Sequence, residues 1–389
     1  MAGETILLSI VLPALNEEKT IGICVTKALK GLKALVGRQG EVVVVDNGSS
    51  DKTAEIAKNL GARVVREEKR GYGNALTAGF RAAKGKYLIV VDADASYDPE
   101  EVIPIFFMKL QEGYDFVIGN RFRGKIEKGA MPFLHRYLGT PVLTGLANLF
   151  FKTHIGDVNC GMRGITREAF EKMRLRVAGM EFATEQAVKA ALLKFKIAEV
   201  PCNVYKDKRQ RKPHLRTWRD GWRHLRLMLL LAPAWTFFLP GFSALASGAA
   251  GLLFFLIRDG LNLPFLPYVN SRHILSSMLV FLTGCQITQL GLMAKAFSFS
   301  RRFDKGSPIM KWVSRYFQLE RGILAGGISM LVGIFLFLYL GLSFYTSFLP
   351  SPPSLLRFDM AVFAAAFFLL GIQSIFASFV LSLFYLKIK

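Results

Sequence analysis

Two aspartates, one residue apart, follow an apolar run and have the spacing of a metal-binding pair. In the stretch YLIVVDADASYDPE, which runs from Tyr87 to Glu100, Asp92 and Asp94 come directly after five apolar residues. Side chains alternate along an extended strand, so these two carboxylates are expected to point the same way. Together they form part of an oxygen cage for Mg²⁺ or Mn²⁺, ions that keep open positions for phosphate oxygens. Many loops contain this spacing by chance, and it is the position after a buried strand that favours a metal site.

Two further apolar runs also end in polar residues. The segment VVVVDNGSSDKT places Asp46 at the tip of one run, where its carboxylate can accept hydrogen bonds from a nucleobase or a ribose. The segment LPALNEEKT ends the first run and contributes Pro13, Asn16 and Glu17. In open α/β sheets, ligands bind in the crevice beyond the carboxyl ends of the strands. We therefore expect the three loops to share one binding site.

A glycine pair lies in the segment KRGYGNAL. Gly71 and Gly73 lack the third glycine of the dinucleotide fingerprint, and the chain contains no GxxxxGK[ST] phosphate loop. These absences argue against a dehydrogenase and against a P-loop NTPase. Either the backbone at Gly73 approaches a phosphate, with Lys69 or Arg70 nearby, or the segment is a plain turn.

The elements that would position these residues alternate along residues 1 to about 225 between short apolar runs and helical patterns. Such alternation predicts an α/β domain with a mostly parallel, Rossmann-like sheet and helices on both faces. The expected strands are Ile6–Leu12, Glu41–Asp46, Arg63–Val65, Tyr87–Asp92 and Phe116–Ile118. The expected helices are Glu17–Leu35, Asp51–Leu60, Gly73–Ala83 and Pro99–Gln111.

The rest of the chain has the composition of a membrane domain. The whole sequence combines 52% hydrophobic residues with a formal net charge of +21, which is typical of a protein that lies partly in a bilayer and contacts anionic lipid. Four apolar segments are each long enough to provide the roughly 20 helical residues that cross a hydrocarbon core. They are approximately Phe237–Ile257, Ile274–Phe299, Ile323–Phe348 and Met360–Leu386. The sequence therefore predicts an all-α transmembrane domain of four helices.

Basic residues predict which side of the membrane the links face. The link between the second and third segments is rich in them, with Arg301, Arg302, Lys305, Lys311, Arg315 and Arg321. Cytoplasmic loops collect Lys and Arg, so this link, both termini and the α/β domain are expected on the cytoplasmic side of the plasma membrane. The early run ILLSIVLPAL is short and lacks the basic leader of a signal peptide, which agrees with that orientation.

A basic amphipathic segment connects the two parts. Arginines recur at three- and four-residue spacing, interleaved with large apolar residues: Arg216, Arg219, Arg223 and Arg226 with Trp218, Trp222 and Leu225. This pattern is typical of a helix that lies on a membrane surface. Nucleic-acid binding, the other use of such a stretch, is disfavoured because a membrane span follows directly. The expected domains are residues 1–206, an interface segment at 207–231 and a transmembrane domain at 232–389.

Several longer motifs resemble those of glycosyltransferase family 2 with the GT-A fold. Within that family they are most similar to the polyprenyl-phosphate sugar synthases of the dolichyl-phosphate mannose synthase group. The resemblance covers residues 6–226 and rests on IVLPALNEEKTIG, VVVVDNGSSDKT, GYGNALTAGFRAAKGKYLIVVDADASYDPEE, FVIGNRF, DVNCGMRGITREAF and MEFATEQAVKA. It implies an inverting, metal-dependent hexosyltransferase at the cytoplasmic face. The donor would be a nucleotide sugar of the GDP-mannose or UDP-glucose type, and the acceptor a polyprenyl phosphate.

The resemblance also implies which residues bind the donor. Asp46 is expected to bind the nucleoside, with Pro13, Leu15 and Glu17 lining its pocket and Gly73 close to the donor.

Metal and phosphate contacts are implied in the same way. Asp92 and Asp94 are expected to hold Mg²⁺ or Mn²⁺ on the donor diphosphate, where the ion neutralises charge on the leaving group. Arg121 in GNRF matches the family's phosphate-contacting arginine. Arg136 in MPFLHRYLGT is either an acceptor-side contact or a residue on a solvated or lipid-facing surface. The acceptor phosphate is ionised near neutral pH, so positioning and charge stabilisation by Asp94, Arg121 and Arg136 can provide most of the rate.

Two positions depart from the family pattern. Many relatives have Gln two residues after the second metal aspartate, where this chain has Ser96. The third metal ligand is therefore Ser96 or a water molecule. The serine-lysine step of the usual basic loop is replaced by RKPHLRTW, close to Arg209 and Arg211, so no acceptor contact is carried over there.

Three further charged residues have two interpretations each. Arg163 either binds phosphate or braces the loop after Asp157. Glu181 and Glu185 either orient a sugar hydroxyl or a loop, or lie on a helix surface.

Other functions also fit parts of the sequence. A polysaccharide synthase or a diacylglycerol glycosyltransferase of the same fold is the nearest alternative, but QRKPHLRTWRDGW lacks the QxxRW segment of processive synthases. A lipid flippase with a regulatory domain would need ionisable residues inside its spans, and the four segments contain almost none. The expected partners are a nucleotide sugar, a polyprenyl phosphate and anionic membrane lipids, with no nucleic acid. A homo-oligomer is compatible with the sequence.

Overall fold

The computed structural model describes residues 5–208, 216–260, 271–300, 319–345 and 354–385. The chain divides into two compact units, Met1–Met228 and Leu229–Lys389. The domain limits predicted at residues 206 and 231 stay predictions.

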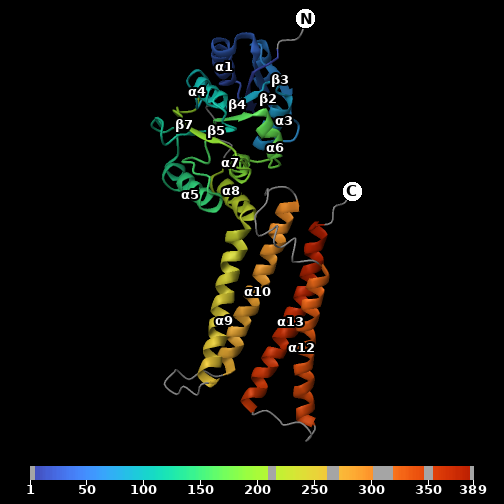
Figure 1. Ribbon diagram of the computed structural model, residues 1–389. Coiled ribbons are helices and arrows are strands. Elements are labelled where there is room, and N and C mark those ends of the chain that lie inside the picture. The colour runs from blue at the N-terminus through green and yellow to red at the C-terminus, as the bar shows by residue number, and fades with distance from the viewer. Residues whose placement is uncertain (1–4, 209–215, 261–270, 301–318, 346–353, 386–389) are drawn as a thin grey trace. The chain divides into compact units, whose positions relative to one another are not determined.

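A seven-stranded sheet lies at the centre of the first unit (Figure 1). Its strands are β1 (Leu8–Ala14), β2 (Gly40–Asp46), β3 (Arg63–Arg66), β4 (Tyr87–Val90), β5 (Phe116–Asn120), β6 (Arg163–Thr166) and β7 (Ile197–Pro201). Their order is β3-β2-β1-β4-β6-β5-β7, and only β6 runs antiparallel to its neighbours. The predicted mostly parallel GT-A type of fold is confirmed. Strands β6 and β7 were not among the predicted ones.

Valine-rich runs form the middle of the sheet because both of its faces are covered. Four consecutive valines in β2 and all four residues of β4 are buried, as expected for strands between two helical layers. The predicted strand Tyr87–Asp92 is too long, because β4 ends at Val90. Asp92 and Asp94 therefore lie in the loop beyond the strand, and strand alternation does not set their directions.

Helices α1 (Ile21–Val36), α2 (Thr53–Asn59), α3 (Tyr72–Ala82), α4 (Pro99–Gln111) and α6 (Arg167–Met173) pack on the sheet. The chain also forms α5 (Thr140–Phe151), α7 (Phe182–Leu192) and α8 (Thr217–Leu231), with a 3₁₀ turn η1 (Gly37–Gln39) and a π-helical turn η2 (His135–Gly139). The chain runs outward from β1 to β3 and then returns to β4 on the other side of β1. Because such crossovers are right-handed, α3 lies on the face opposite α1 and α2. The reversal between β1 and β4 is a topological switch point.

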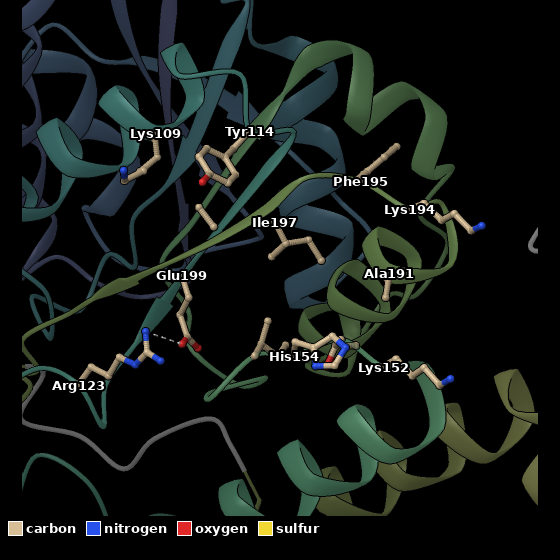
Figure 2. A pocket seen from close by; sticks show the side chains of 13 residues that line it. Lys109, Tyr114, Arg123, Lys152, His154, Ala191, Lys194, Phe195, Ile197 and Glu199 are labelled. Atoms are coloured by element: carbon tan, nitrogen blue, oxygen red, sulfur yellow. Dashed lines mark ion pairs between the residues drawn. The ribbon is translucent and has the colours of Figure 1, made fainter.

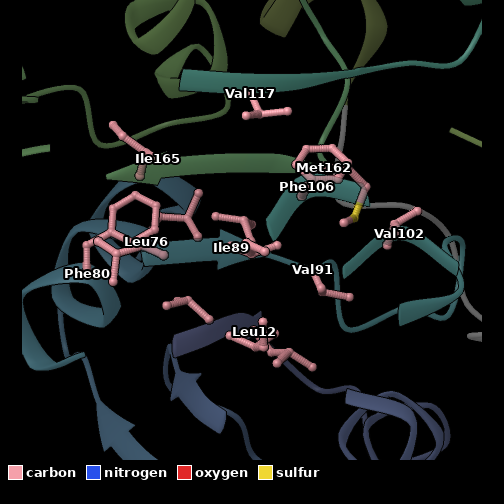
Figure 3. Close-up of a cluster of buried hydrophobic side chains, with 14 of the residues drawn as sticks. Leu12, Leu76, Phe80, Ile89, Val91, Val102, Phe106, Val117, Met162 and Ile165 are labelled. Atoms are coloured by element: carbon pink, nitrogen blue, oxygen red, sulfur yellow. The ribbon is translucent and has the colours of Figure 1, made fainter. Parts of the chain in front are cut away.

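A hydrophobic core continues through the sheet (Figure 3). Leu76 and Phe80 of α3 and Phe106 of α4 are fully or almost fully buried, as are Ile89 of β4 and Ile165 of β6. Packing from both helical layers thus fixes the positions of the strand ends.

The second unit consists of long apolar helices. They are α9 (Leu239–Gly260), α10 (Ser271–Ser300), α12 (Leu319–Tyr345) and α13 (Ser354–Tyr385), after a π-helical turn η3 (Ala234–Phe238). Within this unit α9 packs on α10, α10 on α13 and α12 on α13.

Four stretches among the described residues are long and apolar enough to cross a membrane. They are Ala234–Phe255, Arg272–Ser298, Leu319–Ser343 and Arg357–Phe384. The predicted all-α region of four candidate spans is confirmed. Most of the basic link, residues 301–318, and the C-terminal residues 386–389 lie outside the described residues, as do the predicted ends of the third and fourth spans. The orientation in the membrane therefore stays a prediction.

Gly79 lies where α3 contacts the sheet. A Cβ at this position would be 2.4 Å from Val11 Cγ1 and 2.7 Å from Val45 Cγ2. We expect Gly79→Ala to lower the free energy of unfolding by about 1–3 kcal/mol through overpacking, despite the better helix propensity of alanine. On α1, Gly22→Ala is the matched control, because its Cβ would meet Ile56 Cγ2 at an ordinary 3.6 Å. Denaturant unfolding of the solubilised protein measures the difference, and equal stability of the two variants would contradict this packing.

Candidate active site

Three polar loops lie at the same edge of the sheet. Strand β1 is parallel to β2, with Ala14 level with Asp46, and parallel to β4, with Val11 level with Val90. The carboxyl ends of these three neighbouring strands therefore meet on both sides of the switch point, where open α/β sheets bind ligands. Of the predicted site residues, Pro13 and Asp46 lie in the last two residues of β1 and β2, and the loops at this edge contain Leu15, Glu17, Asp92, Asp94 and Ser96.

The loops after β1 and β2 are tied together by hydrogen bonds. Asn16, which has a positive φ of 56°, accepts the backbone N–H of Ser50 at Oδ1 over 2.8 Å. Its own N–H donates to Ser49 Oγ at 3.0 Å, and the N–H of Glu17 donates to Thr53 Oγ1 at 2.8 Å. The two loops therefore form one ordered unit beside Asp46.

The side chain of Asn47, next to Asp46, is hydrogen-bonded to the backbone of the loop that follows β3. Asp46 is 7% exposed and Asn47 is 4% exposed. Asn47 Oδ1 accepts the N–H of Gly71 at 2.7 Å, while its Nδ2 donates to the carbonyls of Glu67 and Lys69 at 3.0 and 2.9 Å. Asn47 was not identified from the sequence. The signal that could have identified it is its place as a polar residue directly after Asp46, the aspartate at the strand end.

Asp92 and Asp94 are half-buried in the loop beyond β4. The hydroxyl of Tyr72 donates to Asp92 Oδ1 at 3.2 Å. Asp94 Oδ1 accepts the backbone N–H and the hydroxyl of Ser96 at 2.9 and 2.6 Å. The third acid of the stretch, Asp98, caps the start of α4 instead. Tyr72 and Ser96 thus hold the two carboxylates in position.

The oxygen atoms in this loop suit a hard divalent cation. A Cβ on Gly161 would lie 2.1 Å from Asp92 Oδ2, so only glycine leaves room for this carboxylate. Two carboxylates and a serine hydroxyl are the kind of ligand that Mg²⁺ and Mn²⁺ bind. Among the described residues, no group of three His, Cys, Asp or Glu side chains is placed to hold an ion. A metal site at Asp92, Asp94 and Ser96 therefore stays a prediction.

Arg121, directly after β5, forms a two-point ion pair with Asp157. The distances are 2.6 Å from Nε to Oδ2 and 2.8 Å from Nη2 to Oδ1. Asp157 is fully buried, and the Arg121 side chain is 15% exposed. Burial opposes the charge of Arg121, but the hydrogen bonds to Asp157 raise its pKa above its ordinary value. The predicted phosphate contact of Arg121 stays a prediction.

Arg163 braces the same segment from inside the protein. It is 2% exposed, and it donates to the carbonyls of Cys160 at 3.0 Å and Val158 at 2.7 Å, and also to the carbonyl of Ala183. Of its two predicted interpretations, the structure supports the bracing role.

Gly73 contacts protein backbone at the start of α3. A Cβ here would lie 2.0 Å from the Val177 carbonyl oxygen, and the Gly73 N–H donates to the carbonyl of Ala178 at 2.9 Å. Glu185 of α7 holds this same loop, because its carboxylate accepts the N–H groups of Arg176 at 3.1 Å and Val177 at 3.0 Å. Glu185 therefore orients a loop, while donor binding near Gly73 stays a prediction.

Arg136 lies in the turn η2. It is half-buried, and its guanidinium is 5.4 Å from the ring centre of Tyr137. Neighbouring His135 is 2.9 Å from Thr217 Oγ1 at the start of α8. Burial, and then the charge of Arg121, lower the pKa of His135. The predicted loop residues Arg209 and Arg211 lie outside the described residues.

A separate hollow of about 680 Å³ opens elsewhere on the first unit (Figure 2). Its lining includes Arg123 and Glu199, which form an ion pair at 3.4 Å, and the basic residues Lys152 and Lys194. None of the predicted site residues lines it. The hollow is therefore distinct from the sheet edge that carries the aspartates.

Known proteins match both parts of the chain. The Glycosyl transferase family 2 model matches residues 9–174, and the model of the family 2 C-terminal transmembrane region matches residues 292–385. The low-salt glycan biosynthesis hexosyltransferase Agl6 of Haloferax volcanii is 34% identical over 375 residues, which are 96% of this chain and 88% of that protein. The chain belongs to glycosyltransferase family 2. The family predicted from its motifs is thus confirmed.

Further known proteins are similar to part of the chain. The dolichyl-phosphate hexose transferase of Haloferax volcanii is 35% identical over 196 residues, which are 50% of this chain and 81% of that protein. A solved structure of glucosyl-3-phosphoglycerate synthase from Mycobacterium tuberculosis, in complex with Mn²⁺, UDP and glucosyl-3-phosphoglycerate, has 24% identity and a TM-score of 0.46, covering 59% of this chain and 80% of that one. This family 2 chain is a membrane glycosyltransferase related to dolichyl-phosphate hexose transferases.

A buried polar pair joins α8 to α7. His224 Nδ1 lies 2.6 Å from Thr184 Oγ1, and His224 is 5% exposed. Burial, and then the charge of Arg163, lower the pKa of His224 from 6.5 to about 4. The imidazole is therefore neutral in the folded protein at neutral pH.

Acidification should destabilise the fold through His224. Its pKa is 6.5 when unfolded and about 4 when folded, so the unfolded state binds more protons between these values. Above about pH 7 the imidazole is neutral in both states. At about pH 4.5 it is protonated mainly in the unfolded state, which should lower the free energy of unfolding by about 2–3 kcal/mol. His224→Asn retains a polar partner for Thr184 and should lose less stability on acidification. Melting temperatures of both proteins at the two pH values check this, and identical pH dependence would contradict a buried neutral imidazole.

Proposed function

We propose that this family 2 enzyme transfers a hexose from a nucleotide sugar to a polyprenyl phosphate. The observation that supports this most strongly is that Asp46 ends β2 and that Asp92 and Asp94 follow β4, the two strands that flank β1 in parallel. The similarity to a hexosyltransferase over 96% of the chain adds support, because it includes the membrane region. The chain is also similar to a dolichyl-phosphate hexose transferase. Because dolichyl phosphate is a polyprenyl phosphate, this similarity favours a polyprenyl phosphate acceptor over diacylglycerol.

The proposed nucleoside site is the double loop after β1 and β2. Asp46 is buried, and its Oδ1 accepts the backbone N–H of Ser49 at 2.9 Å, so its carboxylate is held in one orientation. From there it would accept hydrogen bonds from the base or ribose. Pro13, Leu15 and Glu17 would line the same pocket.

The proposed metal ligands are Asp92, Asp94 and Ser96. When bound, Mg²⁺ or Mn²⁺ supplies positive charge for the departing diphosphate. The hydrogen bonds from Tyr72 and Ser96 keep the carboxylates in place before the donor arrives, and such preorganisation lowers the cost of stabilising developing charge.

The proposed phosphate contacts are Arg121 and Arg136. Arg121 stays cationic because Asp157 supports its charge, and a guanidinium fork matches phosphate oxygens. An acceptor phosphate oxygen would form a bond to the anomeric carbon as the bond to the donor diphosphate breaks, which inverts the configuration. The attacking oxygen is already ionised near neutral pH, so the site needs no strong general base. We place this reaction on the cytoplasmic side because of the basic link between the second and third spans.

The acceptor and the donor can be tested together. Membranes containing the protein are incubated with a panel of labelled nucleotide sugars and polyprenyl phosphate, and the products are extracted into organic solvent. We expect label in a polyprenyl-phosphate sugar with one class of donor. Label in a diacylglycerol glycoside or in a polymer would contradict the proposed acceptor.

Asp94→Ala should abolish transfer without unfolding the protein. Loss of one charge-stabilising group at a reacting centre typically costs about 100-fold or more in rate, and Asp94 is half-buried in a loop outside the core. Glu100→Ala is the control, because this acid forms a surface pair with Lys30 at 2.7 Å. Turnover and melting temperature are measured for both variants. Retained turnover in the Asp94 variant would contradict its assignment.

Removal of divalent metal should stop transfer reversibly. The protein supplies only a partial oxygen site, so a chelator such as EDTA should remove the ion, and added Mg²⁺ or Mn²⁺ should restore the rate. Initial rates before and after dialysis measure this effect. Full activity in excess chelator would show that Asp92 and Asp94 serve another purpose.

A further inference from the structure

The hollow shown in Figure 2 lies where the C-terminal ends of three helices meet β7, the last strand of the sheet. Lys109 lies in the last turn of α4, Lys152 caps the end of α5, and Lys194 comes two residues after α7. All three line the hollow, as does Ile197 of β7. Its volume of about 680 Å³ is in the range of small-molecule sites, about 300–1,000 Å³.

Most of the charged residues that line the hollow are basic. They are Lys109, Arg123, Lys152 and Lys194, together with the carboxylate of Glu199. Lys109 pairs with Glu112 at 2.7 Å, and Arg123 pairs with Glu199 at 3.4 Å. In the part of the chain that the structure describes, neither Lys152 nor Lys194 forms an ion pair, and both are exposed. Two positive charges in the lining are therefore not balanced by carboxylates.

A lysine at a helix C-terminus can simply offset the helix dipole, so the two amounts of charge must be compared. Each C-terminus carries about half a negative charge, and the ends of α4, α5 and α7 together bring about −1.5. The charges of Lys152 and Lys194 exceed this amount. The hollow therefore keeps a net positive charge and favours an anion.

The backbone at three lining residues has the left-handed conformation that favours glycine. The φ angles of Lys152, His154 and Lys194 are 55°, 55° and 56°. A residue with a Cβ costs about 1 kcal/mol or more in this conformation, and glycine is the usual residue directly after a helix. The chain has a basic or titratable side chain at all three positions around one hollow. Strained backbone grouped in this way is typical of ligand sites.

The turn that carries Lys152 and His154 is held by the side chain of Asn148. Asn148 Nδ2 donates to the carbonyl of Ile155 at 2.8 Å, and Asn148 Oδ1 accepts the N–H of Ile155 at 3.1 Å. The same oxygen accepts the hydroxyl of Thr153, which is 5% exposed. Because the turn is already ordered, a ligand loses little affinity to ordering its backbone.

We propose that this hollow binds a small soluble molecule that carries two or more phosphate groups. Lys152 and Lys194 are its charge partners, with Arg123 and His154 beside them. Lysine binds phosphate as a point charge, and its flexible stem lets the ammonium turn toward a ligand. The two lysines come from the ends of different helices, so a ligand with several phosphate groups can contact both. The proposal does not depend on the function proposed above.

Acetylation of lysines tests this site without any measurement of turnover. The full chain in phosphatidylcholine nanodiscs, with EDTA present to remove divalent metal, is treated with a water-soluble acetylating reagent. Tripolyphosphate is the probe, and sodium chloride of the same ionic strength is the reference. Mass spectrometry gives the acetylation rate of each lysine. Lys33 is the matched control, because it is an exposed lysine in the last turn of α1 and does not line the hollow.

We expect tripolyphosphate to slow the acetylation of Lys152 and Lys194 several-fold and to leave Lys33 unchanged. In Lys152→Gln, Lys194 should lose most of this protection, because the shared ligand has lost one partner, whereas Lys33→Gln should keep it. Unchanged rates at Lys152 and Lys194, equal slowing at Lys33, or full protection of Lys194 in Lys152→Gln would each overturn the proposal. Protection by phosphatidic acid in the nanodiscs but not by tripolyphosphate would show a lipid headgroup site and overturn it as well.

Discussion

The parallel register of β1 with β2 on one side and β4 on the other is the constraint on which the site depends. It ends three neighbouring strands at one edge, so that the loops carrying Glu17, Asp46 and Asp92 meet there. The register in turn depends on valine-rich strands buried between two helical layers. A slip of one residue along a strand would turn its side chains to the other face, and the same slip would move the polar loop away from its neighbours.

The supporting hydrogen bonds explain why the acids hold their positions. Asn47 fixes the loop that leads to Tyr72, and Tyr72 donates to Asp92. Gly161 gives Asp92 the space it occupies, and it belongs to the same short segment as Asp157, the partner of Arg121. Tyr72 and Gly161, from two distant stretches of the chain, thus both contact Asp92. Because each of these polar groups is satisfied by another, loss of one member is expected to disturb the others.

The sequence was sufficient to predict the fold class, the four apolar helices and the aspartates at the strand ends, because each depends on local pattern. It placed the end of β4 too late, since an apolar residue such as Val91 looks the same inside a strand and just beyond it. Asn47, Tyr72 and Gly161 were not recognised, because their roles depend on partners more than ten residues away in the chain. The regular spacing of arginines predicted an amphipathic helix on a membrane surface, and the helix itself is present as α8.

A structure of the full chain with Mn²⁺ and a nucleoside diphosphate would test the central claim most directly. The account predicts the ion at the β4 loop, within about 2.0–2.6 Å of carboxylate oxygens of Asp94, Asp92 or both, with the diphosphate on the same ion and the nucleoside beside Asp46. An ion bound elsewhere, or a nucleotide away from the shared edge of β1, β2 and β4, would contradict it.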